Sequence, residues 1–191
     1  MLKKFIILMI FPLLAFSAED KYIIDKTHFA IGFLVEHVGY AKTLGMFRDI
    51  DGSYSHDLTT NKINDINISI KTGSVFTNHD KRDQHLMSPD FLNVEKFPEM
   101  SFKATDISIQ DDITTISGEL TLLGITKPLI LTGKINKIGK YPFGGIIKPY
   151  VMGISARGTI KRSQHGMNYA LKDDLVGDEI DLIIEFEARR Q

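Results

Sequence analysis

The sequence predicts an all-β domain, either a sandwich or a barrel, with one short helical segment near residues 79–96. Apolar and polar residues alternate with a period of two along most of the chain, which is the pattern of half-buried strands. Turn residues such as Asp51-Gly52 and Gly144-Gly145 separate these runs. Helical periodicity is confined to the one segment, which argues against a βαβ arrangement.

The last strand shows the alternation most clearly. Apolar Ile180, Leu182, Ile184 and Phe186 face one way, and acidic residues occupy most of the positions between them. The same pattern predicts strands over residues 29–37, 64–70, 114–122 and 127–136. Between residues 136 and 160 two prolines, Pro142 and Pro149, interrupt the alternation and leave the strand boundaries undefined.

The helical segment carries three local signals. Residues 82–86 have the composition of a short polar helix. Ser88-Pro89-Asp90 predicts a helix start, with Ser88 as N-cap, Pro89 at the first helical position and Asp90 near the positive end of the dipole. Pro98 would end any helix and precedes an expected strand over residues 100–104.

The N-terminal residues 1–17 are predicted to be a signal peptide. Lys3 and Lys4 precede an apolar run over residues 5–16 that is too short to span a bilayer comfortably, and Ala15-Phe16-Ser17 fits a cleavage site. We therefore expect the protein to be exported and residues 18–191 to form one domain; an uncleaved membrane anchor is the alternative. The chain has no Cys, which excludes disulfides and a lipid-modified cysteine.

Composition and motifs also exclude several functions. The net charge is −1 and 25% of the residues are charged, which argues against nucleic acid as a partner. The six His residues form neither H-x-H nor H-E-x-x-H, and no G-x-S-x-G is present. We therefore predict no catalytic residues, no metal site and no cofactor apart from a bound ligand.

Several ordered motifs point to one family. Residues 77–91 read T-x(4)-R-D-x-H-L-x-S-x-D-F, residues 118–128 read G-E-L-T-L-L-G-I-T-K-P, and Asp25-x-x-His28 and Gly177-Asp178-Glu179-Ile180 flank them. From about residue 21 onward the chain resembles the YceI-like family of periplasmic polyisoprenoid-binding proteins. The resemblance implies a lipocalin-like antiparallel eight-stranded barrel around a long apolar channel that holds a lipid chain, and no catalytic residues.

The alternation alone supports a filled core as well as a channel, because large and small inward residues can simply fill a barrel's taper. The resemblance favours the channel. The residues expected to line it are Phe29, Ile31, Phe33, Val35, Phe47, Phe91, Phe97, Phe102, Leu120, Leu122, Leu131, Ile154 and Phe186. Among them, Phe91 and Phe97 flank the strand-free segment and are expected to form a lid at the barrel mouth.

A lipid head group would need hydrogen-bond donors near that mouth. The candidates are Asn78, Lys81, Arg82 and His85, with Arg162 as a second guanidinium. The planar fork of an arginine can bond two phosphate oxygens at once. The alternative is that these side chains pair with their neighbours and hold the loops in place.

The predicted function is binding, transport or storage of an isoprenoid-type amphiphilic lipid, with a polyprenyl or quinone chain. One alternative is an enzyme or accessory factor in isoprenoid-quinone metabolism. Another is a structural or interaction barrel that binds no lipid. The expected partner is a long-chain lipid; transient membrane contact and a homodimer are compatible with the sequence.

Overall fold

The computed structural model describes residues 19–57, 59–60, 62–173 and 175–191, and the predicted signal peptide lies outside these ranges. The described elements follow one another as β1 (Asp20–His37), β2 (Ala41–Phe47), β3 (Ile50–Asp57), β4 (Lys62–Lys71), η1 (Thr72–Ser74), β5 (Val75–Phe76), α1 (Asp80–Met87), β6 (Glu99–Gln110), β7 (Ile113–Leu122), β8 (Ile125–Lys140), β9 (Tyr150–Lys161), η2 (Arg162–His165) and β10 (Val176–Arg190).

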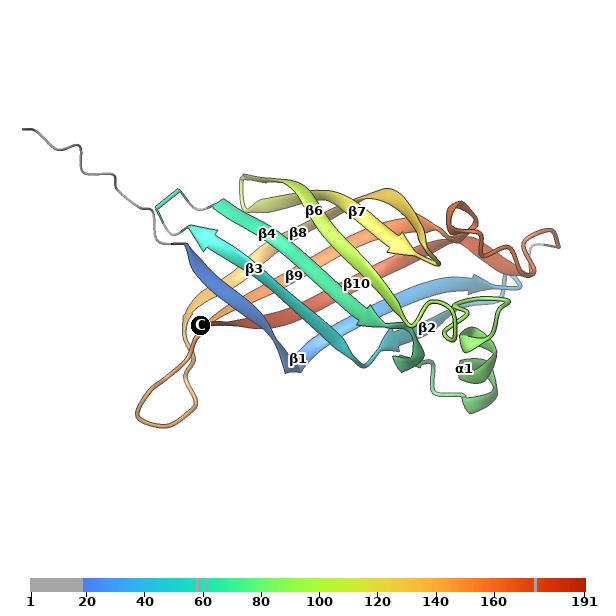
Figure 1. Cartoon of the computed structure of the whole chain (residues 1–191), viewed down its shortest axis with the longest axis horizontal. Coiled ribbons are helices and arrows are strands. Elements are labelled where there is room, and N and C mark those ends of the chain that lie inside the picture. Colours follow the sequence, from blue (N-terminus) through green and yellow to red (C-terminus); the bar gives the residue numbers. More distant parts are fainter. Residues whose placement is uncertain (1–18, 58, 61, 174) are drawn as a thin grey trace, which may run out of the picture.

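Eight strands close into an antiparallel barrel, which confirms the predicted architecture (Figure 1). The ring runs β1–β3–β4–β6–β7–β8–β9–β10, and β10 pairs back onto β1. The strands β2 and β5 lie outside this ring. The strand β2 pairs antiparallel with the second half of β1, and β5 pairs with β2. Closure satisfies the backbone groups that an open sheet would leave at its edges.

Alternation along each strand sends one set of side chains into the barrel. On β10, Leu182 pairs with Phe33 and Ile184 pairs with Ile31, so that apolar residues of the first and last strands meet inside. On β8, a Cβ on Gly133 would lie 2.2 Å from the carbonyl oxygen of Ser155 on β9. Only glycine fits that position, because any side chain would force the two strands apart.

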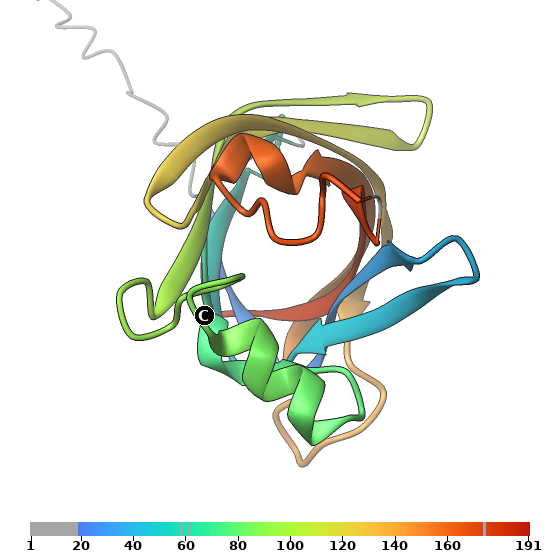
Figure 2. The same cartoon turned by 90° about the vertical axis from the view of Figure 1, so that its right-hand side faces the viewer.

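The two ends of the barrel differ. At the end where β3 stops and β4 starts, the ring of Tyr22 stacks on that of Tyr54 with centroids 5.2 Å apart, and Met152 and Ala188 are fully buried beside them. The opposite end carries α1 and η2, and Figure 2 views the barrel from that side. One end is therefore packed shut, and helices and loops cover the other.

The helical segment corrects one prediction. The helix α1 begins after His79, whose Nδ1 accepts a hydrogen bond from the backbone N–H of Arg82, and it ends at Ser88. Ser88 is thus a C-cap and does not start a second helix; its carbonyl accepts from Phe91 and Asn93 as the chain turns. Serine followed by proline marks a helix end as readily as a helix start, since proline is common just after a C-cap.

Proline also explains the region that the alternation left undefined. The strand β8 ends at Lys140 and β9 begins at Tyr150, so the interrupting Pro142 and Pro149 both lie in the connecting hairpin loop. No helix among the described residues is both long and apolar enough to cross a membrane.

Candidate functional site

A cavity of about 620 Å³ lies inside the barrel. It runs between the end that carries α1 and the packed end, where Tyr54 forms part of its wall. Its lining is mostly aliphatic and aromatic, and the polar residues that line it include Lys81, Arg82, His85, Lys134 and Arg162. The barrel is therefore not completely filled by its own side chains. Eleven of the predicted channel residues line this cavity: Ile31, Phe33, Val35, Phe47, Phe91, Phe102, Leu120, Leu122, Leu131, Ile154 and Phe186.

Phe29 lies elsewhere, contrary to expectation. The register of β1 against β10 shifts between Ile24 and Phe29, and at this irregularity the Phe29 ring lines a separate groove of about 510 Å³. That groove lies beside the base of the β8–β9 hairpin, and Tyr141 and Pro142 also line it. Phe29 is partly buried and also packs against the core cluster.

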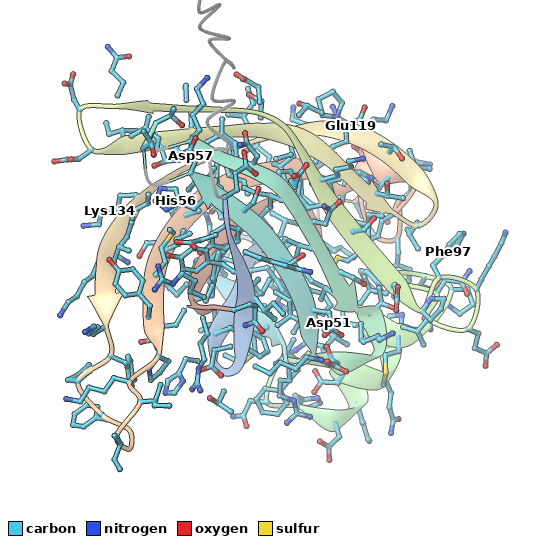
Figure 3. The ribbon with its side chains drawn as sticks, turned by 60° about the vertical axis from the view of Figure 1, so that its left-hand side comes forward. Asp51, His56, Asp57, Phe97, Glu119 and Lys134 are labelled. Atoms are coloured by element: carbon cyan, nitrogen blue, oxygen red, sulfur yellow. The ribbon has the colours of Figure 1, made fainter. Side chains whose placement is uncertain are left out.

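Phe97 is also not a lid residue. A Cβ on Gly124 would lie 2.9 Å from its Cε1, so the ring packs on the β7–β8 turn instead of entering the barrel. Figure 3 shows Phe97 at the outer edge of the molecule. The lid prediction fails for Phe97 because a proline-bounded loop has no alternation from which an inward face could be assigned.

Phe91 does cover the end of the cavity, together with two other rings. The Phe91 side chain is 7% exposed, and its ring centroid lies 5.0 Å from that of His85 and 5.2 Å from that of Tyr169. The ring centroids of His85 and Tyr169 are 4.9 Å apart. Rings from α1, the turn after it and the loop between η2 and β10 therefore meet over the mouth of the cavity. Tyr169 was not predicted, since it lies in a loop without a strand or helix pattern.

The candidates for head-group binding occupy different positions. Lys81, Arg82 and His85 line the cavity at its α1 end, and Asn78 is absent from its described lining. Arg82 donates from Nε to Thr77 Oγ1 and from Nη2 to the Thr77 carbonyl, both at 2.7 Å. His85 Nε2 lies 2.8 Å from a carboxylate oxygen of Asp90.

Thr77 is hydrogen-bonded to two residues of α1, Arg82 and Asp83. Besides the two bonds from Arg82, its backbone N–H donates to Asp83 Oδ1 at 2.8 Å, and Asp83 is itself buried. Asn78 follows with a φ of 61°, a left-handed conformation that asparagine tolerates better than most residues. The loop before α1 is therefore held by its own side chains, as the structural alternative for Arg82 predicts.

Arg162 fits the structural alternative. The side chain is 1% exposed, and its guanidinium donates to the carbonyls of Gly177 at 2.7 Å, Met167 at 2.9 Å and Val176 at 2.6 Å. Burial lowers the pKa of this guanidinium, and the nearby Asp178 opposes that shift. Because these donors already bond backbone oxygens, the geometry offers little to a head group here.

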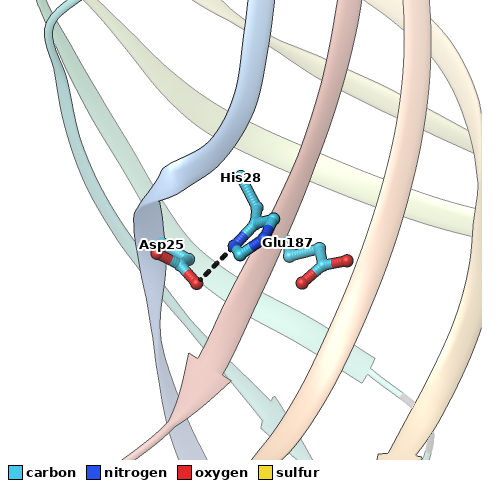
Figure 4. A group of neighbouring side chains, drawn as sticks. All are labelled: Asp25, His28 and Glu187. Atoms are coloured by element: carbon cyan, nitrogen blue, oxygen red, sulfur yellow. Dashed lines mark hydrogen bonds and ion pairs between the residues drawn. The ribbon is translucent and has the colours of Figure 1, made fainter. Parts of the chain in front are cut away.

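A possible metal-ligand cluster lies outside the barrel, between β1 and β10. One ligand atom each from Asp25, His28 and Glu187 lies within 4.8 Å of the others (Figure 4). Asp25 already accepts bonds from Thr27 N–H at 3.0 Å and from Arg189 Nε at 2.9 Å. The Arg189 guanidinium therefore already neutralises this carboxylate, and Asp25, Thr27, His28 and Arg189 form a hydrogen-bond network that joins the two strands beside Glu187.

Known proteins share this architecture and sequence. The model of the YceI-like domain matches residues 22–188. Protein YceI of Escherichia coli O157:H7 is 37% identical over 198 residues, covering 100% of both chains. The crystal structure of the Campylobacter jejuni YceI protein superposes with a TM-score of 0.69 at 28% identity, over 82% of this chain and 90% of that one.

A polyisoprenoid binding domain from Saccharophagus degradans, implicated in plant cell wall breakdown, has the same fold. Its TM-score is 0.65 at 9% identity, over 91% of this chain and 100% of that one. The family model spans nearly the whole barrel, from β1 to β10. The chain therefore belongs to the YceI-like family.

Proposed function

We propose that this protein binds a long-chain isoprenoid-type lipid inside the barrel and serves its transport or storage in the periplasm. The single observation that carries the proposal is the apolar cavity of about 620 Å³ that ends beneath the rings of Phe91 and Tyr169. The shared fold with a domain described as polyisoprenoid binding supports the choice of ligand class. The charged N-terminus and apolar run of residues 1–17 support export.

The size of the cavity sets the length of chain that it can hold. If a carbon group occupies about the 30 Å³ of a water molecule, the volume corresponds to roughly 20 such groups. Each methylene removed from water contributes about 0.8 kcal/mol, from which the cost of ordering the chain is subtracted. Apolar contact alone can thus give tight binding of roughly four isoprene units.

The polar end of the lipid would lie at the α1 end. Lys81 and Arg82 are exposed there and line the cavity mouth. The packed end, by contrast, is closed by stacked Tyr22 and Tyr54. A charged head group at the mouth keeps its contact with water, whereas at the packed end it would lose its hydration.

The first test is extraction of the purified protein with organic solvent, followed by mass spectrometry. A lipid recovered in stoichiometric amount is expected. A protein that yields no lipid and binds none when titrated with geranylgeraniol, a prenyl alcohol of about 20 carbons, would overturn the proposal. Chemical conversion of the added lipid would instead identify an enzyme.

A matched pair of variants tests the location of the ligand. Ala156 is 3% exposed and lines the cavity, so Ala156→Phe should reduce geranylgeraniol binding at least tenfold by filling the space. Ala41→Phe places the same ring on an exposed position of β2 and should leave binding unchanged. Circular dichroism checks that both variants fold. Equal binding by the two variants would place the lipid outside the barrel.

A further inference from the structure

The β8–β9 hairpin ends in an exposed apolar tip. Phe143 is 73% exposed, Ile146 105% and Ile147 89%, where large apolar side chains would ordinarily be covered. The loop projects away from the barrel at the end opposite α1 (Figure 1). Three such side chains on one projecting loop form an exposed apolar patch, a feature that often marks a contact with a protein or a membrane.

The charged residues in the loop's own sequence are all of one sign, although Glu185 and Glu187 lie beside its base. Residues 137–150 contain Lys137, Lys140 and Lys148 and no acidic residue, whereas the whole chain has a net charge of −1. Tyrosines stand at both bases of the loop: the ring of Tyr141 lies 6.0 Å from that of Phe143, and Tyr150 packs under the guanidinium of Arg190. An apolar tip above a layer of lysines and tyrosines matches the layers of a membrane interface.

We propose that the tip formed by residues 143–147 inserts into the surface of an anionic phospholipid bilayer. The apolar side chains would enter the boundary between head groups and acyl chains, while the lysines contact anionic head groups. A stable protein interface needs about 20 to 30 residues on each side, far more than this narrow tip offers. The pair Gly144-Gly145, with a φ of 119° at Gly144, allows the loop to adapt its shape to the surface.

The position of the tip bears on how the barrel would sit on a membrane. Because the tip and α1 lie at opposite ends, contact through the tip leaves the cavity mouth directed away from that bilayer. The inference does not depend on what the cavity binds, so its test can fail while the lipid proposal stands.

Fluorescence gives a direct test, because the chain contains no Trp. Phe143→Trp introduces a single tryptophan at the tip, and its emission should shift to shorter wavelength on addition of phosphatidylcholine vesicles that contain phosphatidylglycerol. Raising the salt concentration should weaken the shift. Tyr40→Trp, at a 91% exposed position of the β1–β2 hairpin, is the matched control and should show none.

Vesicle co-sedimentation of the full protein provides the second measurement. Ile146→Ser combined with Ile147→Ser should lower the bound fraction at least fivefold. Leu44→Ser combined with Ile130→Ser removes two other exposed apolar side chains and should leave it unchanged.

Three results would overturn the inference. The first is an unchanged emission of Phe143→Trp, and the second is an equal shift in both tryptophan variants. The third is a dimer, seen by light scattering, that the Ile146→Ser and Ile147→Ser pair dissociates while vesicle binding persists, which would assign the tip to contact between copies of this chain.

Discussion

The buried guanidinium of Arg162 donates from Nε to the carbonyl oxygen of Gly177 at 2.7 Å, which links η2 to the start of β10. Two further carbonyls, those of Met167 and Val176, accept from the same side chain. The segment between η2 and β10 contributes Tyr169 to the cover of the cavity. One side chain therefore holds in place a loop whose described residues form neither helix nor strand.

Arg162→Met should lower the free energy of unfolding by about 3 kcal/mol, because it leaves three carbonyl oxygens without their donor. Arg162→Lys should restore only part of that loss, since an ammonium cannot reproduce the planar fork. Chemical denaturation measures both changes. Lys161→Met, at an exposed neighbouring position, is the control and should shift stability by less than about 0.5 kcal/mol. A similarly small shift for Arg162→Met would contradict the structural role.

A second pair of variants tests whether Phe91, and not Phe97, controls release of the lipid. Phe91→Leu should accelerate release of a bound prenyl lipid about tenfold or more, because it weakens the contact with His85 and Tyr169 over the cavity. Phe97→Leu should leave the rate unchanged, since that ring packs on Gly124 outside the barrel. Stopped-flow transfer of the lipid to acceptor vesicles measures both rates. Equal rates in the two variants would show that release does not pass the rings.

These results show which features a single sequence can predict. Alternation correctly predicts that Ile184 and Phe186 share the inner face of β10. Side chains of a strand alternate between its two faces, so this feature can be read from neighbouring residues alone. Closure of the ring depends on the pairing of β1 with β10, two strands from opposite ends of the chain. No local pattern encodes that pairing, so alternation alone does not distinguish a barrel from a sandwich, and only the family resemblance favours the barrel.

Loops were predicted less well than strands, for a physical reason. Ser88 carries a capping signal that serves either end of a helix, and only the hydrogen bond from its N–H to the His85 carbonyl identifies it as a C-cap. Phe97 and Tyr169 lie outside helices and strands, so no repeating backbone conformation sets the direction of their side chains. That direction depends instead on contacts with residues distant in the sequence.

Asp25 should make stability depend on pH. Burial would raise the pKa of its carboxyl group, but hydrogen bonds from Thr27, His28 and Arg189 outweigh that effect and hold the pKa far below its usual value of 3.8. A depressed pKa stabilises the fold above the unfolded value, near pH 4, and this contribution is lost as the pH falls further. The contribution should therefore be complete at neutral pH.

Asp25→Asn should accordingly lower the free energy of unfolding by about 2 kcal/mol at pH 7, the size expected for charged hydrogen bonds to a carboxyl group that is 8% exposed. The gap between wild type and variant should narrow as the pH is lowered below about 4. Asp106→Asn, on an exposed position of β6, is the control and should change stability only slightly. Urea denaturation at several pH values measures both, and a gap that stays constant for Asp25→Asn would refute the assignment.

Tyr54 is expected to behave in the opposite way to most buried polar residues. Its side chain is 2% exposed, and its hydroxyl has no hydrogen-bond partner among the described residues. Burial raises the pKa of this hydroxyl well above its usual value, so it stays neutral. Tyr54→Phe keeps the stack on Tyr22 and removes a polar group that lost its hydration without gaining a bond.

Tyr54→Phe should therefore raise the free energy of unfolding by about 1 kcal/mol, which thermal and chemical denaturation can both detect. Thr114→Val should act in the same direction, because the Thr114 hydroxyl is also buried without a described partner. Tyr40→Phe, on an exposed side chain, should change nothing. If Tyr54→Phe instead destabilises the protein, the hydroxyl must be bonded to solvent or ligand inside the barrel, and the packed end would have to be regarded as a polar binding surface.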